Sequence, residues 1–210
     1  SLSSVHTLSI SSNSSLTANG GLFSIYTSYT NIAWISYNSS ETNPWSYHLY
    51  PLSATGTQSN RPGAKFAYAT SGDRVVALDF QDNTFLFVVI QTASGFYFGK
   101  YNSGNQAWSF AYQFALSGSS GSYNAITDVR SSNYVVAYYQ QIIKFGFGGV
   151  MNGYGKTTAN TYPVDMQYVS SYDSVPCLFI LNSQTSTGTQ LYINIVKYSD
   201  LSTVNSIVVT

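Results

Sequence analysis

Residues Val75 to Leu116 read VVALDFQD, NTFLFVVIQTAS, GFYFGKYNSG and NQAWSFAYQFAL. Each run has the length of a strand and is rich in Val, Phe, Tyr, Ile and Trp, which suit a pleated surface. The breaks between the runs are rich in Asn, Asp, Ser and Gly, which tolerate the tight backbone of hairpin turns. The stretch therefore predicts a four-stranded meander of about 42 residues, which is close to the size of one propeller blade.

The rest of the chain resembles degenerate copies of this unit. Its most apolar runs, FLFVVI, YVVAYY and CLFIL, are each followed by a third strand ending in Lys or Tyr and a turn: FGKYNSG, IIKFGFGG and INIVKYSD. No segment has an apolar stripe with helical spacing. We predict an all-β fold, a small β-propeller of about four four-stranded blades, in one domain over 13–210 with repeats at 13–72, 73–118, 119–163 and 164–210. The alternative is a two-sheet β-sandwich with a donated strand, because many short strands with polar turns fit both folds.

The opening segment, residues 1–12, matches the end of the chain. SLSSVHTLSIS at the start corresponds to DLSTVNSIVVT at the close, and both look like the outer strand of a blade. Since the fourth repeat already has such a strand, the opening one is left without a place in its own ring. We predict that residues 2–11 add to a sheet edge of a neighbouring subunit, with Val5, Leu8 and Ile10 as contact residues. The alternative is a chance likeness between two short Ser/Val-rich runs.

The composition indicates a surface that hardly titrates. Charged residues make up only 8% of the chain and aromatic residues 16%, with 19 Tyr and 12 Phe. Eight basic residues balance eight acidic ones, which gives no electrostatic footprint for nucleic acid or an anionic membrane, and no apolar run is long enough for membrane insertion. The hydroxyl-rich surface suits a secreted, extracellular or cell-surface protein, or packing against like subunits. A compositional habit of the source is the alternative.

Residues that could carry chemistry are few and scattered. His6 and His48 are the only histidines, Glu41 is the only Glu, and no Ser sits in a G-x-S-x-G turn. The single Cys177 lies in the apolar run VPCLFIL, which predicts a buried, inert thiol. We therefore expect no enzyme activity, no metal site and no cofactor.

Two other kinds of residue could mark a surface. Asn13 and Asn38 begin N-glycosylation sequons in expected loops, so covalent N-glycans are a candidate modification. Trp34, Trp45 and Trp108 could form flat platforms for sugar rings, since Trp has a large apolar face and a polar handle. The alternative is that most of the aromatic residues fill the core between blades.

The stretch from Phe96 to Tyr112 carries a family likeness. It resembles bacterial and protist β-propeller repeats of the form apolar strand, Lys-Tyr, Ser-Gly-Asn, then Trp, with the turn Asn102-Ser103-Gly104-Asn105 and Trp108 matching best. That resemblance implies a propeller used as a scaffold or surface repeat, and nothing catalytic. The composition is also similar to secreted surface proteins of thermoacidophilic archaea and of ciliates, some of which form threads by passing a strand between subunits.

These observations favour one function. We expect a structural protein, a self-assembling subunit of an extracellular fibril, filament or surface layer, whose partners are copies of itself joined head to tail by strand addition. The alternative is a carbohydrate-binding propeller, a lectin or adhesin module, and a hydrolase on a propeller scaffold is a third class.

Overall fold

A computed structural model describes residues 17–26, 31–37, 45–51, 64–65, 73–82, 84–92, 95–102, 105, 107–115, 125–159, 161–184 and 190–209. Before residue 73 the description covers the strand backbone and not the side chains. Every regular element in this part of the chain is a strand, which confirms the all-β class.

The strands form four antiparallel sheets of four strands, and within each sheet the strands follow in chain order. The first sheet holds β1 (Thr17–Tyr26), β2 (Asn31–Tyr37), β3 (Trp45–Pro51) and β4 (Ala64–Lys65); the second, β5 (Arg74–Phe80), β6 (Phe85–Thr92), β7 (Gly95–Asn102) and β8 (Ala107–Ala115). The third holds β9 (Ala125–Arg130), β10 (Asn133–Tyr138), β11 (Gln141–Gly146) and β12 (Met151–Lys156); the fourth, β13 (Thr161–Tyr172), β14 (Val175–Gln184), β15 (Leu191–Lys197) and β16 (Thr203–Val209). The meander expected from Val75 onward is thus confirmed as β5–β8.

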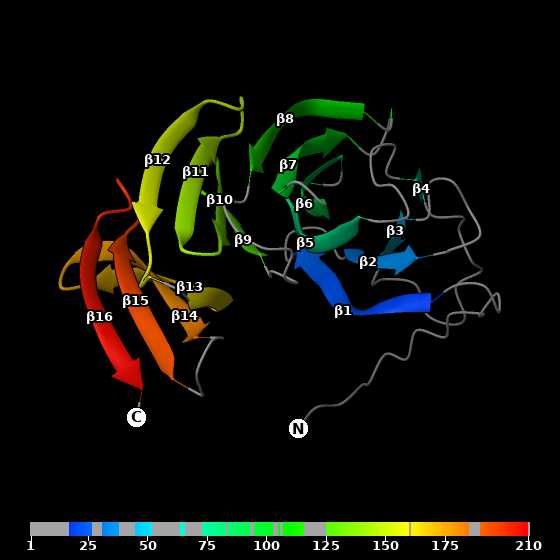
Figure 1. Ribbon diagram of the computed structural model, residues 1–210. Coiled ribbons are helices and arrows are strands. Elements are labelled where there is room, and N and C mark those ends of the chain that lie inside the picture. The colour runs from blue at the N-terminus through cyan, green and yellow to red at the C-terminus, as the bar shows by residue number, and fades with distance from the viewer. Residues whose placement is uncertain are drawn as a thin grey trace, which may run out of the picture.

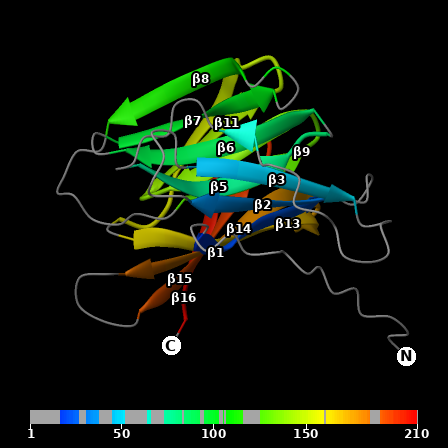
Figure 2. The ribbon, with the colours of Figure 1, turned by 90° about the vertical axis from the view of Figure 1, so that its right-hand side faces the viewer.

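The sheets are arranged as a fan around their first strands. β1 lies against β5, β5 against β9, and β9 against β13, while the last strand of each sheet lies toward the outside (Figure 1). Figure 2 shows the same fan from the side, with the second sheet above the first. Within the described residues no closed ring of sheets is found, because no comparable contact joins β13 to β1.

The hairpins that join the first two strands of the third and fourth sheets contain residues with positive φ angles. Ser131 and Ser132 have φ angles of 49° and 62°, and Asp173 and Ser174 have 48° and 66°. Two successive residues with positive φ define the turn whose twist matches that of the flanking strands. The two turns are therefore equivalent positions of the repeat.

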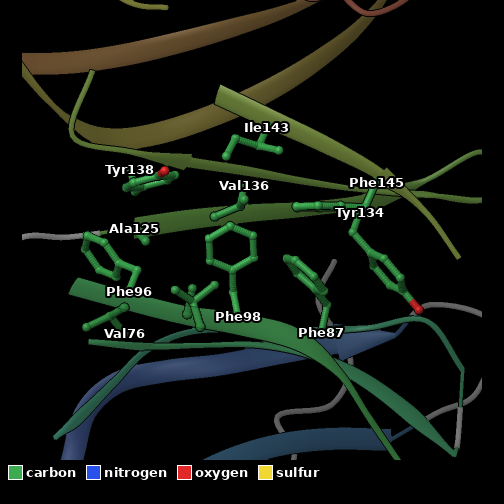
Figure 3. Close-up of a cluster of buried hydrophobic side chains, with 12 residues drawn as sticks. Val76, Phe87, Phe96, Phe98, Ala125, Tyr134, Val136, Tyr138, Ile143 and Phe145 are labelled. Atoms are coloured by element: carbon green, nitrogen blue, oxygen red, sulfur yellow. The ribbon is translucent and has the colours of Figure 1, made fainter. Parts of the chain in front are cut away.

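An aromatic layer fills the space between the second and third sheets (Figure 3). The rings of Phe87 and Tyr134 are stacked with centroids 4.5 Å apart, and those of Phe98 and Phe114 with centroids 4.9 Å apart. Phe98 also contacts Phe145 of the third sheet at 5.4 Å. Such contacts add to the free energy gained by removing the rings from water.

A second layer joins the third and fourth sheets. Leu178, Ile180 and Val196 of the fourth sheet pack against Val135, Ala137 and Ile142 of the third, and all six are at most 1% exposed. The third sheet is thus covered on both faces. Its middle strand β10 is accordingly apolar on both faces, as in sheets that are buried from both sides.

Replacing Phe98 by Ala tests the first layer. Because Phe98 is fully buried and its ring has four aromatic neighbours, we expect F98A to lower the free energy of unfolding by about 3–5 kcal/mol. Chemical denaturation measures this change. The exposed Ser109 of β8 is the control, and S109A should stay within about 0.5 kcal/mol of the parent chain. Equal effects of the two substitutions would contradict the layer.

Buried tyrosines make the fold sensitive to alkali. Burial, followed by the charge of Asp82 for Tyr134 and by Tyr154 for Tyr138, raises the pKa of both phenols above its usual range. The stabilisation from these neutral phenols is fully present below about pH 10, where free tyrosine ionises, and is lost as the pH rises further. In an alkaline titration followed at 295 nm we expect some tyrosines to ionise only when circular dichroism reports unfolding. Ionisation of all 19 Tyr near pH 10 in a folded chain would contradict this expectation.

Candidate assembly surface

Three lysines occupy one position of the repeat. Lys100 pairs with Phe87, Lys144 with Val135 and Lys197 with Cys177. Each pairing partner is the third residue of the second strand of its sheet, β6, β10 or β14. The lysines therefore lie in the same register on the third strands of the second, third and fourth sheets.

Lys144 connects the third sheet to the fourth. Its Nζ donates hydrogen bonds to the carbonyl oxygens of Tyr198, at 2.6 Å, and of Ser199, both in the turn between β15 and β16. The residue is only 5% exposed. Desolvation lowers the pKa of its ammonium group, and the charge of Asp200 opposes that shift. The buried cation is thus held by the carbonyls of the next sheet.

Lys100 makes the corresponding contact one sheet earlier. Its Nζ lies 3.4 Å from the carbonyl oxygen of Phe147, which belongs to the turn between β11 and β12 of the third sheet. The same ammonium group lies 4.0 Å from the centre of the Phe85 ring. In both cases a third-strand lysine reaches the last turn of the sheet that follows it in the chain.

Tyrosine hydroxyls make contacts in the opposite direction. Tyr134 of the third sheet donates to the side chain of Gln81, next to the first hairpin of the second sheet. Tyr198 of the fourth sheet donates to the carbonyl of Arg130, 2.8 Å away, at the first hairpin of the third sheet. The Arg130 guanidinium group also lies 4.3 Å from the centre of the Tyr168 ring. Each of the two interfaces therefore combines an apolar layer with a lysine contact and a tyrosine contact.

The lysine contact between the third and fourth sheets needs close backbone approach. A Cβ atom on Gly155 of β12 would lie 2.4 Å from the carbonyl oxygen of Leu201 and 3.0 Å from its Cβ. Leu201 is buried and has a φ angle of 61° in the turn that Lys144 holds. A side chain at position 155 would therefore push the fourth sheet away from the third.

Two glycine substitutions test this fit. We expect G155A to lower the free energy of unfolding by about 1–3 kcal/mol, because backbone atoms cannot move aside as a flexible side chain can. Gly148 provides the control, since a Cβ atom there would meet nothing within 4 Å. Thermal melts of both variants measure the difference, and an unchanged melting temperature for G155A would show that the two sheets are not this close.

The inward face of the fourth sheet, which is covered by the third, also carries a polar cluster. Asn182 donates to Asn194 Oδ1 at 2.7 Å, and Asn194 donates to Thr158 Oγ1 at 2.9 Å and to Ser206 Oγ at 3.0 Å. Both asparagines are at most 2% exposed. The cluster links the connection between β12 and β13 to the fourth sheet.

The outward face of the fourth sheet is the opposite one. Because side chains alternate along a strand, it consists of Cys177, Phe179, Leu181, Ile193, Ile195 and Lys197. Burial of Cys177 is confirmed, and that burial raises the pKa of its thiol. Ile195 on this face is also buried, at 1% exposed, and among the described residues no hydrogen bond or ion pair of the Lys197 ammonium group is found.

β16 forms the outer edge of the fourth sheet. It pairs with β15 on one side, and among the described strands none pairs with its other side. All seven residues are exposed, with Val204 at 40% and Val208 at 43%. The sequence TVNSIVV contains neither a charged residue nor a proline. β16 is thus an uncharged outer strand whose residues are all exposed.

The residues singled out from the sequence lie in several places. Val5, Leu8, Ile10, Asn13 and Asn38 lie outside the described residues. Trp34 is on β2 and Trp45 on the neighbouring β3, both in the first sheet, whereas Trp108 is on β8 of the second. The half-buried Trp108 ring is contacted edge to face by Tyr97 and Tyr101, with centroids 5.4 and 5.2 Å away.

Sequence reasoning missed the role of the lysines. The signal was present, since FGK, IIK and IVK recur at the ends of third strands, but it did not say which groups the lysines contact. In the described residues no group of three or more His, Cys, Asp or Glu could hold a metal ion. The same part of the chain contains no helix that is long and apolar enough to cross a membrane.

No known protein-family model matches the chain, and no curated protein is significantly similar to it.

Proposed function

We propose that this chain is a propeller-type subunit of an extracellular filament or surface layer, joined to copies of itself by strand addition. The proposed blade architecture is supported by the chain order within each sheet and by the fan around β1, β5, β9 and β13. In propellers the first strand of each blade lies near the axis and the last lies outside.

The observation that carries the proposed function is the free edge of β16. An exposed, flat and apolar strand edge presents a row of unpaired N–H and C=O groups to any strand that can align with it. Proteins that remain monomeric usually protect such edges with lysine, proline or bulges. β16 has no lysine and no proline, and its one register shift lies at Ile195/Val196, near the start of the strand.

The proposed occupant of this edge is the opening segment, residues 2–11, of a second copy. Its sequence LSSVHTLSIS is similar to LSTVNSIVVT at 201–210, so it has the alternation and composition of a strand that already fits this sheet. Val5, Leu8 and Ile10 are the proposed contact residues. Because the donor and acceptor are different surfaces, the contact repeats head to tail and extends as a filament unless the rotation between copies closes a ring.

The composition supports an extracellular setting. Only 8% of residues are charged and the formal net charge is zero, so copies do not repel one another over long distances. N-glycans on Asn13 and Asn38 are part of this proposal. No catalytic role is proposed.

A truncation and an edge substitution test the proposal. We expect the chain lacking residues 1–11 to remain folded but monomeric by sedimentation velocity, because the donated strand is gone. We expect I207K to abolish filaments seen by electron microscopy, since a charge on β16 opposes strand pairing. Ile207 is 43% exposed, so folding should be retained.

V150K is the matched control for this experiment. Val150 is 72% exposed, but it lies in the turn before β12 rather than on the edge of the fourth sheet, so its filaments should be unchanged. If the truncated chain still forms filaments, the opening segment is not the donor. If I207K forms them, β16 is not the acceptor.

A further inference from the structure

The outer strand of the third sheet contains the dipeptide Asn152-Gly153. In an Asn-Gly dipeptide the glycine nitrogen reaches the carbonyl carbon of the asparagine side chain most easily, because glycine has no Cβ atom to obstruct it and its backbone turns freely. Asn19-Gly20 on β1 is the other Asn-Gly dipeptide of the sequence, but the side chain of Asn19 is not among those described. The surroundings of the carboxamide are therefore known for Asn152.

Asn152 lies at a β-bulge. Lys144 pairs with Gly153 and Phe145 pairs with Met151, so Asn152 has no partner on β11. A bulge disrupts the ladder locally and leaves its extra residue unpaired. β12 is also the last strand of its sheet, on the outside of the fan (Figure 1). The backbone that must turn to bring the Gly153 nitrogen to the Asn152 side chain is thus less constrained than in the middle of a sheet.

The side chain of Asn152 is accessible to water. The residue is exposed, and its Nδ2 donates a hydrogen bond to Asn133 Oδ1, 2.8 Å away at the start of β10. This hydrogen bond must break if Nδ2 is to leave the side chain. Because it joins two neutral groups that water can also reach, its loss slows the departure of Nδ2 only about fivefold. The contact with Asn133 therefore does not protect the carboxamide.

We propose that Asn152 is a site of spontaneous deamidation in the folded chain, independently of the proposed self-assembly. The Gly153 nitrogen forms a bond to Asn152 Cγ and gives up its proton. The bond from Cγ to Nδ2 breaks, and ammonia leaves with that proton. Water then opens the resulting succinimide ring. Attack at Cγ gives aspartate, and attack at the backbone carbonyl carbon gives isoaspartate, in which the chain runs through the former side chain.

Both products change the contacts of β12. A carboxylate at position 152 has no N–H group to donate to Asn133, and it adds a negative charge to a chain whose formal net charge is zero. Isoaspartate also lengthens the backbone by a methylene group just before Gly153 and Gly155. Cβ atoms at these glycines would lie 3.1 Å from Lys144 Cε and 2.4 Å from the Leu201 carbonyl oxygen, so β12 has little room to shift here. The modification thus disturbs the interface between the third and fourth sheets.

Peptide mapping of the intact chain tests the proposal. The chain is kept in mildly alkaline buffer, below the pH at which its buried tyrosines ionise, and samples taken over time are digested with trypsin. Cleavage after Arg130, Lys144 and Lys156 releases peptides 131–144 and 145–156, whose only asparagines are Asn133 and Asn152. We expect Asn152 to gain the mass of amide hydrolysis at least about tenfold faster than Asn133, which is followed by tyrosine. Equal rates would overturn the proposal.

The same measurement in guanidinium chloride separates the effect of the sequence from that of the fold. In the unfolded chain Asn152 reacts at the rate that its Asn-Gly sequence allows. We expect the rate in the folded chain to lie within about tenfold of that value, since only an exposed hydrogen bond and an edge strand oppose the reaction. Protection by more than about tenfold would show that the bulge keeps the Gly153 nitrogen away from Cγ, and would overturn the proposal.

Two variants add a second measurement. N152S has no carboxamide, so its peptide 145–156 should gain no mass under the same conditions. N152D carries the aspartate product from the start. We expect N152D to melt at a lower temperature than N152S, because serine retains a hydroxyl that can donate to Asn133 Oδ1 and a carboxylate has no donor. Equal melting temperatures would contradict the expected effect on β12.

Discussion

Burial of the third sheet on both faces is the constraint on which the rest of the structure depends. Tyr134, Val136 and Tyr138 of β10 pack toward the second sheet, while Val135 and Ala137 pack toward the fourth. A strand in this position cannot alternate between apolar and polar residues, because neither face meets water. Its neighbours must supply two complementary apolar faces, and the sheets on either side accordingly present an apolar face to it.

Apolar layers alone would allow neighbouring sheets to slide, since the hydrophobic effect has no direction. The Lys144 contact restricts the relative position of the two sheets. Its ammonium group must reach the carbonyl oxygens of Tyr198 and Ser199 to compensate for its lost hydration. In the opposite direction, the Tyr198 hydroxyl of the fourth sheet donates a hydrogen bond to the Arg130 carbonyl of the third sheet. Two polar contacts at the margins of an apolar layer thus determine how far one sheet is rotated and shifted against the next.

Much of the described fold could be predicted from sequence, because its pairings are local. The middle strands are predicted by the apolar runs FLFVVI, YVVAYY and CLFIL, and the hairpins by the Asn/Ser/Gly-rich breaks. Contacts between sheets could not be predicted in the same way. Nothing in IIKFGFGG says that Lys144 reaches a turn more than 50 residues away, since that contact depends on the angle between two sheets. On sequence alone Trp108 could be a surface platform or a core residue, and its half-buried ring is contacted by Tyr97 and Tyr101 of the neighbouring strand.

The strictly sequential order of strands in every sheet has a consequence for how the chain acquires its structure. Each hydrogen-bonded ladder joins strands that are neighbours in the chain, so only short loops must close to form it. All-β domains usually fold slowly because their ladders join distant segments. Here the contacts between distant segments join one sheet to another, so we expect them to form after the ladders within each sheet. Each meander can therefore form as it leaves the ribosome and dock on the one before it, so that unpaired strands are exposed only briefly during synthesis.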